Sequence, residues 1–247
     1  MRYFLDLSYL GTAYHGWQIQ KNAHSVQAET NRALSTYLRE EINVTGSGRT
    51  DTGVHARQQI VHFDIDKDID PKQLLFKLNA LLPNDIAAKG FKPVIKEAHA
   101  RFDAVKRSYQ YLMHTRKTPF VEGLSYYFPH LLDIEEMNKA TKLLLGKQNF
   151  QCFSKVKTEV NTFDCDINAA YWILENEKLV FHVSADRFLR GMVRAIVGTL
   201  LMVGERKMTL EDFQNVLDSR DRRKAGRSVP AHGLYLTEVI YPPETYI

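Results

Sequence analysis

The hydrophobic and polar positions along the chain predict the order strand, helix, strand, strand, helix, strand, and they predict it twice. Alternating apolar residues indicate strands, whereas apolar residues three and four positions apart indicate helices. In the first half the predicted elements are strand 2–8, a helix capped by Ser25, strands 42–45 and 58–65, helix 71–82 and strand 88–95. In the second half they are strand 104–115, a helix from 133 to 146, a hairpin of 166–175 and 179–184, helices 187–203 and 209–219, and strand 234–241.

Two copies of this order predict an α+β fold of two ferredoxin-like βαββαβ units with a mainly antiparallel sheet. The first unit would span residues 1–103 and carry a glycine-rich loop, and the second would span residues 104–247. No flexible or low-complexity linker separates the halves, so we expect them to share a sheet or to border a central cleft.

The composition narrows the class of protein. With 44% hydrophobic and 25% charged residues, the chain has the profile of an ordinary globular protein. It contains no apolar run of about 18 residues and no signal-peptide pattern, so we expect no membrane contact and a cytoplasmic location. Two cysteines, Cys152 and Cys165, fit a reducing compartment and leave a disulfide between them open.

The glycine-rich loop, Gly46-Ser-Gly-Arg-Thr-Asp-Thr-Gly-Val-His55, places one carboxylate, Asp51, between predicted strands. Its glycines permit backbone angles and close approaches that a Cβ would forbid. A charged side chain on so tight a loop is typical of a group presented to a substrate. The alternative is a structural turn in which Asp51 only caps the backbone.

Positive charge gathers in the C-terminal third of a chain whose net charge is only +4. On the predicted helix 187–203, Arg187, Arg190 and Arg194 fall on one face, with no acid at the spacing that would neutralise them. Such a face favours contact with phosphates, although a solvated polar face is the alternative. Further cations follow at Arg220, Arg222, Arg223, Lys224 and Arg227.

Two aromatic segments are candidates for base contacts. Tyr109 and Tyr111 would point to one side of a strand, either as core residues or as a platform for stacked RNA bases. The segment Gly11–Gln18 would be either a binding loop or a packed turn.

Several chemistries lack their signatures. There is no Walker A loop, no dinucleotide fingerprint and no nucleophile elbow. His55 and His62 lack the spacing of a metal site, so we expect neither metal nor cofactor. A solitary carboxylate among arginines points to Asp51 as a nucleophile, because nearby positive charge keeps it ionised.

The segment Gly48-Arg-Thr-Asp-Thr-Gly-Val-His-Ala56 resembles the catalytic signature of the tRNA pseudouridine synthase A family. The resemblance extends over nearly the whole chain, and separated motifs in the right order are more specific than any single one. The other matching segments are Gly11–Gln18, Ser25–Gln27, Ala100–Phe102, Arg107–Tyr109, Phe150–Phe153, Phe188–Arg194 and Gly233–Leu236.

The resemblance implies a pseudouridine synthase fold and a cofactor-free isomerase that converts uridine to pseudouridine at positions 38 to 40 of the tRNA anticodon stem-loop. It also implies a homodimer that binds tRNA. Asp51 would be the nucleophile, attacking either the sugar C1′ or the uracil C6. Arg49 would fill the space of the flipped uridine, and Tyr109 would stack on that base and assist proton removal from C5. Arg194 would pair with Asp51, and Leu234 would wall the pocket.

The sequence departs from the family pattern at a few positions. Gly191 stands where a larger residue is common, and we expect it to loosen the start of helix 187–203.

Two other classes of protein remain as alternatives. Paired ferredoxin-like units also describe a non-catalytic RNA-binding protein, but its typical aromatic motif is missing. A glycosidase would need a second acid, which only Asp64 or Glu29 could supply through the tertiary structure.

Overall fold

The computed structural model describes residues 1–155 and 160–247, which divide into two compact units. Unit 1 consists of Met1–Lys106 and Tyr235–Ile247, and unit 2 of Arg107–Leu234. Each unit combines helices with largely antiparallel strands, as the sequence predicts for an α+β protein. The predicted domain 104–247 includes the last strand, whereas the contacts of residues Tyr235–Ile247 assign them to unit 1.

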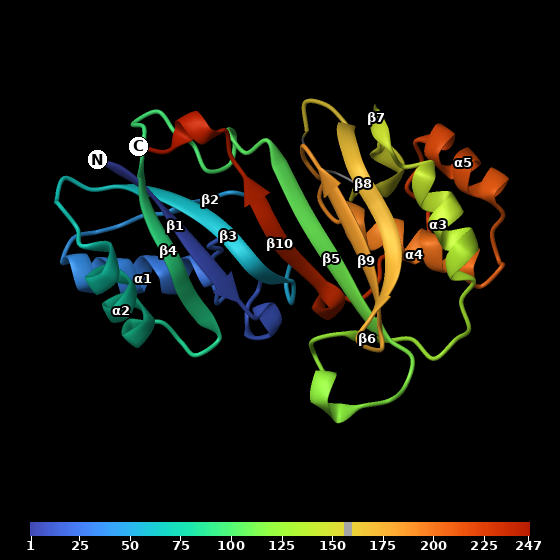
Figure 1. The fold of residues 1–247 in the computed structure, drawn as a ribbon, viewed down its shortest axis with the longest axis horizontal. Helices are drawn as coiled ribbons and strands as arrows, with labels where there is room; N and C mark the ends of the chain where they lie inside the picture. The colour runs from blue at the N-terminus through green and yellow to red at the C-terminus, as the bar shows by residue number, and fades with distance from the viewer. Residues whose placement is uncertain (156–159) are drawn as a thin grey trace. The chain divides into compact units, whose positions relative to one another are not determined.

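Unit 1 is a sheet covered on one face by two helices. Its elements are β1 (Arg2–Tyr9), α1 (Val26–Leu38), β2 (Thr45–Gly46), β3 (His55–Asp64), α2 (Pro71–Leu81), β4 (Ile86–Val94) and, from its second residue, β10 (Leu234–Ile240). The strand order is β4-β1-β3-β10, with β2 also paired to β3. Only the β3–β10 pair is parallel among these described pairs. Figure 1 shows α1 and α2 side by side against this sheet.

The ends of both helices follow from local chemistry. Ser25 caps α1 as predicted, its hydroxyl accepting the Ala28 N–H at 3.3 Å. Asp70 caps α2, and Pro71 occupies the first turn, where its missing N–H costs no hydrogen bond. The buried side chains recur at helical spacing, with Leu34 on α1 and Leu74 and Leu78 on α2 fully buried.

The predicted strand 42–45 is wrong, since the described strand is only Thr45–Gly46. The reason is that side chains of α1 bind the backbone that a neighbouring strand would need. Asn31 accepts the Val44 N–H at 3.1 Å, and the Gln27 amide donates to the Val44 carbonyl at 2.7 Å. The apolar side chain of Val44 is buried, which explains why the pattern resembled a strand.

In unit 2, three helices pack together against largely antiparallel strands. Its elements are β5 (Lys106–His114), β6 (Tyr126–Tyr127), α3 (Ile134–Lys142), β7 (Gly146–Asn149), β8 (Asp164–Glu175), β9 (Lys178–Ala185), α4 (Met192–Gly204) and α5 (Leu210–Ser219). The strand order is β5-β9-β8-β7, and β6 pairs in parallel with β5. The hairpin between β8 and β9 turns through Asn176 and Glu177, both with positive φ, as the sequence predicts.

Two predicted helices of unit 2 are too long. The helix expected at 133–146 ends at Lys142, and Gly146 instead opens the edge strand β7. The helix expected at 187–203 begins only at Met192. Gly191 precedes it with φ 73°, a left-handed conformation that interrupts a helix and suits glycine. Gly191 therefore sets the start of the helix rather than loosening it.

Other predictions concern membranes and cysteines. Among the described residues, no helix has the length and apolar character to cross a membrane. Cys152 and Cys165 are free thiols, so the disulfide left open by the sequence is not formed. Both are buried, and burial raises the pKa of each thiol to about 12.

His62 on β3 ties the sheet of unit 1 to the segment before β5. Its side chain is 7% exposed, and Nδ1 accepts the Ala100 N–H at 3.1 Å. Burial lowers the pKa of His62 to about 4, and the positive charges of Arg2 and His99 act in the same direction. The folded protein therefore holds this histidine neutral at pH values where the unfolded chain protonates it.

This difference in pKa predicts a loss of stability in acid. Between pH 6.5 and 4 the unfolded chain binds a proton at His62 that the folded chain does not, so the free energy of unfolding falls as the pH drops. His62→Gln does not titrate and should remove on the order of 2 kcal/mol of that pH-dependent loss. Urea unfolding at several pH values measures the slope. His15→Gln, at an exposed histidine, is the control. An unchanged slope in His62→Gln would contradict the assignment.

Candidate active site

The Asp51 loop is fixed at its base by the hairpin that carries it. The Ser47 N–H donates to the Ile60 carbonyl at 2.7 Å, and the Ser47 hydroxyl donates to Gln59 Oε1 at 3.0 Å. The Gln59 amide in turn donates to the Gly48 carbonyl at 2.8 Å. Gln59 is fully buried, so a buried side chain supplies the hydrogen bonds that a longer strand β2 would have supplied.

A second anchor comes from the segment Gly11–Gln18, which lies behind the loop. The Trp17 N–H donates to the Thr50 carbonyl at 3.1 Å, and the hydroxyls of Tyr9 and Thr50 hydrogen-bond at 2.8 Å. A Cβ on Gly16 would stand 2.5 Å from the Thr50 carbonyl oxygen, and Gly16 has φ 91°. This segment is therefore a packed turn that supports the Asp51 loop.

A third anchor closes the loop at its far end. The buried side chain of His55 accepts the Gly11 N–H at Nδ1, at 3.0 Å, which leaves the ring proton of a neutral histidine on Nε2. Gly53 has φ 77°, and the Val54 N–H donates to the Asp51 carbonyl at 3.1 Å. His55 thus has a structural role, and the described residues contain no group of His, Cys, Asp or Glu able to hold a metal.

Buried and accessible side chains alternate along the Asp51 loop. Thr50 is buried, whereas Arg49 and Thr52 are exposed and Asp51 is half-buried. The hydrogen bonds of Thr50 and Val54 fix the backbone on both sides of Asp51. The backbone that carries the Asp51 carboxylate is therefore held in one conformation.

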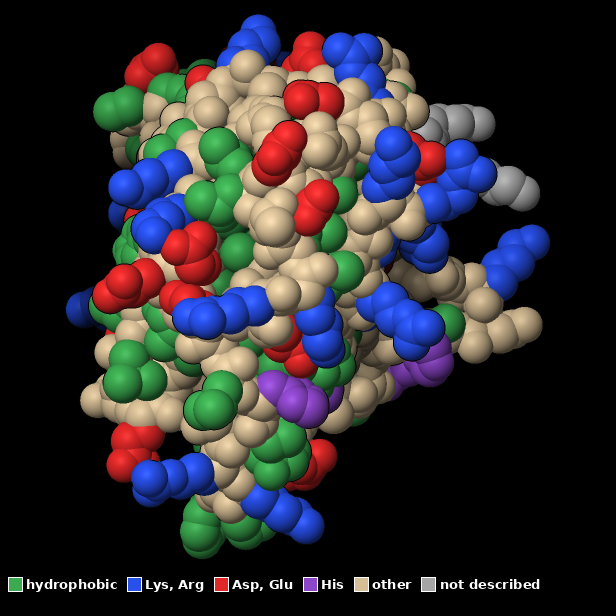
Figure 2. Space-filling view, turned by 90° about the vertical axis from the view of Figure 1, so that its right-hand side faces the viewer, with side chains coloured by type: hydrophobic (Ala, Val, Ile, Leu, Met, Phe, Trp, Pro, Cys, Tyr) green, Lys and Arg blue, Asp and Glu red, His purple; other side chains and the backbone are tan. Residues whose placement is uncertain are grey.

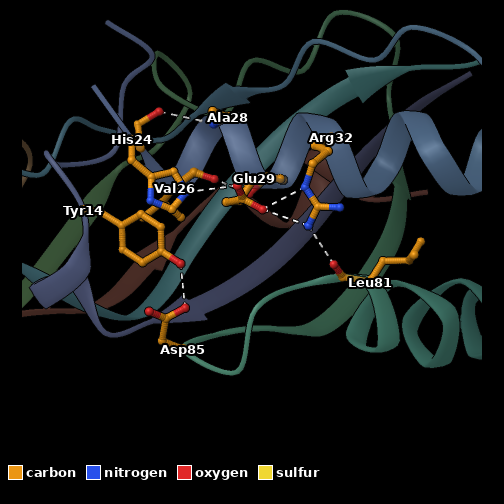
Figure 3. A network of polar contacts seen from close by, with 10 residues as sticks. Tyr14, His24, Val26, Ala28, Glu29, Arg32, Leu81 and Asp85 are labelled. Atoms are coloured by element: carbon orange, nitrogen blue, oxygen red, sulfur yellow. Dashed lines mark hydrogen bonds and ion pairs between the residues drawn. The ribbon is translucent and has the colours of Figure 1, made fainter. Parts of the chain in front are cut away.

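A polar network holds the supporting turn in place. The Tyr14 hydroxyl donates to Asp85 at 2.6 Å, and its ring lies 4.9 Å from that of His24. Figure 3 shows Tyr14 and Asp85 pointing toward each other and Glu29 between His24 and Arg32. Burial of Glu29 acts against its charge, but the hydrogen bonds from His24 and Arg32 prevail and lower the pKa of Glu29.

Glu29 and Asp64 were the acids considered for a glycosidase. Glu29 is committed to His24 and Arg32, at 3.0 and 2.9 Å. Asp64 binds Arg2 through two hydrogen bonds of 2.8 and 2.7 Å. Each acid is held by a cation of its own, so neither supports that alternative.

Tyr109 lies in unit 2, on β5. It is half-buried, and its ring meets that of Phe188 edge to face, with centroids 5.1 Å apart. Arg107, two residues earlier, donates to the Asp186 carbonyl at 2.9 Å and so ties β5 to the segment that carries Phe188. Tyr109 therefore has a supported ring and remains accessible.

Of the two alternatives that the sequence leaves for Tyr111, a core residue or part of a stacking platform, the structure supports the core residue. Tyr111 is fully buried, and its hydroxyl donates to the Pro230 carbonyl at 2.8 Å. Burial raises the pKa of Tyr111 well above its ordinary value. It is a core residue that fixes the segment leading into β10.

The predicted arginine face is also wrong in its geometry. Arg187 and Arg190 precede α4, so they lie on the loop between β9 and α4, and Arg194 alone is helical. Arg190 is exposed, whereas Arg187 and Arg194 are half-buried. The Arg194 Nε donates to the Val229 carbonyl at 2.7 Å, and the Val229 N–H donates back to the Arg194 carbonyl at 3.2 Å.

Leu234 completes the set of predicted site residues. It is buried, and it begins β10 directly before Tyr235, which pairs with His55. The structure thus brings Arg49 and Asp51 together on one loop of unit 1. Unit 2 carries the remaining candidates, which are Tyr109, Arg187, Arg190, Arg194 and Leu234.

The basic cluster of residues 220–227 follows α5. Arg222 donates to the Ala225 and Gly226 carbonyls, and Arg223 pairs with Asp221 at 2.7 Å, so these two shape the segment. Lys224 and Arg227 are exposed. Figure 2 shows several Lys and Arg side chains close together at the right of that view, with few Asp or Glu side chains among them. The charge of this face suits an anionic partner.

The sequence did not reveal which residues support the loop. Thr50, Gln59 and Tyr9 make hydrogen bonds that support it, and none was a candidate. A glutamine at a buried strand position was the one available signal, because a buried amide needs polar partners.

Fold and site together describe a class of protein: an α+β protein of two units, the first of which presents a half-buried carboxylate on a loop with a fixed backbone. The model of a tRNA pseudouridine synthase family matches residues 7–103 and 140–242. The chain is 49% identical to a tRNA pseudouridine synthase A of Parabacteroides distasonis, over 99% of this chain and 98% of that protein. It is 46% identical to the protein of that name from Porphyromonas gingivalis, over 100% and 99%. It is 39% identical to that of Bacillus subtilis, over 98% and 99%.

The chain belongs to the tRNA pseudouridine synthase family. It is accordingly an isomerase that acts on tRNA.

The contact between Gly16 and Thr50 predicts a mutational effect. Gly16→Ala adds a Cβ against the Thr50 carbonyl at a left-handed φ, so it should lower the free energy of unfolding by about 2 kcal/mol. Gly48→Ala is the control, because its Cβ would meet no atom within 4 Å. Urea unfolding compares the two variants, and equal stability would contradict the packing described.

Proposed function

We propose that this protein converts uridine to pseudouridine at positions 38 to 40 of the tRNA anticodon stem-loop, with Asp51 as the nucleophile. The observation that carries the proposal is the Asp51 loop, whose backbone is fixed on both sides of an accessible carboxylate. The family membership supplies the reaction class, and the loop supplies the group that performs it.

The reaction is an isomerisation, so nothing is added overall. The Asp51 carboxylate forms a bond to the nucleotide while the N1–C1′ bond breaks, and the uracil then rotates. C5 bonds to C1′, C5 loses its proton and N1 gains one, and Asp51 leaves unchanged. A fixed carboxylate suits these steps because it must hold the nucleotide throughout the rotation.

A uridine inside a stem must leave the base stack first, at a cost of a few kcal/mol. Arg49 is exposed two residues before Asp51, so one loop can deliver both the side chain that fills the vacated space and the nucleophile. Tyr109 would stack on the flipped base and assist proton removal from C5. Arg194 would pair with Asp51, and Leu234 would wall the pocket.

We infer that each unit is ferredoxin-like. In unit 1 the chain order β1, α1, β2, β3, α2, β4 and the sheet order β4-β1-β3-β2 support this assignment. In unit 2 the order β5, α3, β8, β9, α4, followed by β10, supports it when β10 is counted with the second domain. The proposed division into domains 1–103 and 104–247 assigns β10 to the second domain in this way.

The binding of tRNA would use phosphate contacts from Arg187 and Arg190. Both lie on the loop before α4, where guanidinium groups suit phosphate oxygens. We further propose a homodimer, on the ground of the family resemblance. We propose a location in the cytoplasm, which two buried free thiols support.

The nucleophile is tested with tRNA that carries tritium at uracil C5. Wild type should release tritium, whereas Asp51→Asn should release it at least about 1,000-fold more slowly while keeping its affinity for tRNA. Asp66→Asn, an exposed carboxylate elsewhere in unit 1, should behave like wild type. Turnover by Asp51→Asn at the wild-type rate would remove Asp51 from its role. Binding without release by wild type would instead indicate a non-catalytic RNA-binding protein.

The hydroxyl of Tyr109 is tested separately from its ring. Tyr109→Phe keeps the ring and its edge-to-face contact with Phe188, so tRNA affinity should be retained. The single-turnover rate should fall by about 10- to 100-fold if the hydroxyl takes part in proton transfer. Tyr109→Leu also removes the ring and should weaken binding as well. A wild-type rate in Tyr109→Phe would leave Tyr109 as a stacking group.

A further inference from the structure

Unit 1 contains a hollow that the proposed reaction does not use. Its volume is about 420 Å³, within the range of roughly 300–1,000 Å³ that ligand pockets span. Three of its lining residues are small and lie on adjacent strands: Ser8 on β1, Ala56 on β3 and Ala87 on β4. Ser8 and Ala87 are cross-strand partners, and larger side chains at these two positions would fill the space.

Two cations line the hollow. The Arg57 guanidinium lies 5.6 Å from the centroid of the Tyr235 ring, and Arg57 is exposed. The Lys89 ammonium forms an ion pair with Asp6 at 3.6 Å, and the Lys89 side chain is 43% exposed, so a ligand can also reach it. Asp85 is the one carboxylate among the lining residues, and it already accepts a hydrogen bond from Tyr14 (Figure 3). The hollow therefore favours an anion.

The hollow adjoins the supports of the Asp51 loop. Tyr9 is one of its lining residues, and its buried side chain hydrogen-bonds Thr50 through the hydroxyl. Tyr235 lines it as well and stacks on His55, with ring centroids 4.6 Å apart. Arg57 follows Asp51 by six residues, so the two lie at most about 20 Å apart along the chain. A polymer held at Asp51 can reach this distance with a few nucleotides.

We propose that this hollow binds a phosphate–ribose unit of the RNA whose uridine reacts at Asp51, with Arg57 and Lys89 contacting the phosphate. The proposal rests on the proposed function and adds a second contact to it. Arg57 and Lys89 present separate donors to one anion, and Tyr235, whose ring lies under Arg57, is beside the ribose. Binding there also bears on the residues that fix the loop.

The test compares charge-removing variants of nearly equal size. Arg57→Gln, Lys89→Gln and the double variant are measured against Lys72→Gln, an exposed cation on α2 outside the hollow. The affinity for an unmodified tRNA transcript is determined over a series of salt concentrations. The double variant should lose affinity about 10-fold or more and reduce the slope of log affinity against log salt by about 0.7 to 0.9 for the lost phosphate contact. Lys89→Arg should restore most of the affinity lost in Lys89→Gln.

Turnover at saturating tRNA separates this inference from the proposed function. The double variant should raise KM and leave the maximal rate of tritium release near that of wild type, because neither residue touches the reacting uridine. Failure of wild type to release tritium would overturn the proposed function, whereas the salt slopes would still report on the hollow. Slopes and affinities equal to those of Lys72→Gln would overturn the hollow as an RNA contact.

A last experiment measures the binding of small anions to the hollow. Calorimetric titration with inorganic phosphate and with uridine 5′-monophosphate tests whether a small molecule occupies the hollow. One result would overturn the proposal: inorganic phosphate saturates wild type but not the double variant, while both bind tRNA equally well. That result would assign the hollow to a free anion. Loss of tRNA affinity in the double variant, with weak binding of both small probes, supports it.

Discussion

The rest of the site depends on the buried hydrogen bonds of Thr50. Its carbonyl accepts the Trp17 N–H, and its hydroxyl bonds to Tyr9, so one residue ties the Asp51 loop to both β1 and the turn behind it. A buried polar group that lost such a partner would cost about 1–3 kcal/mol, which makes the arrangement stiff. The carboxylate next to Thr50 is thereby held in position although it lies on a loop.

The support extends inward through polar contacts rather than through apolar packing alone. Tyr14 connects the turn to Asp85, and Gln59 connects the hairpin to the Gly48 carbonyl. Each buried donor in these contacts meets an acceptor, which restricts the backbone more narrowly than apolar contacts do. Unit 1 thus separates two sets of residues: those with buried side chains hold the loop, and Arg49, Asp51 and Thr52 between them keep accessible side chains.

The same supports form part of the wall of the hollow. Tyr9, Tyr235 and Asp85 each have one contact with the loop or its supporting turn and one side toward the hollow. A nucleotide bound there would add binding energy that is the same before and during the reaction. Such binding lowers KM without raising the maximal rate.

The sequence by itself determined the α+β class, the order of the main elements and the position of Asp51 on a glycine-rich loop, because periodicity, capping residues and glycines are local properties of the chain. Only the tertiary structure decided the rest. The pattern around Val44 predicts a strand, but α1 binds its backbone. The spacing of Tyr111 allows either a platform or the core, and the residue is buried. The pattern at Arg187 and Arg190 predicts a helix, but both precede Gly191, after which the helix begins. Thr50 and Gln59 gain their roles from partners distant in sequence. Such partners are set by packing, and packing is not encoded in the spacing of neighbouring residues.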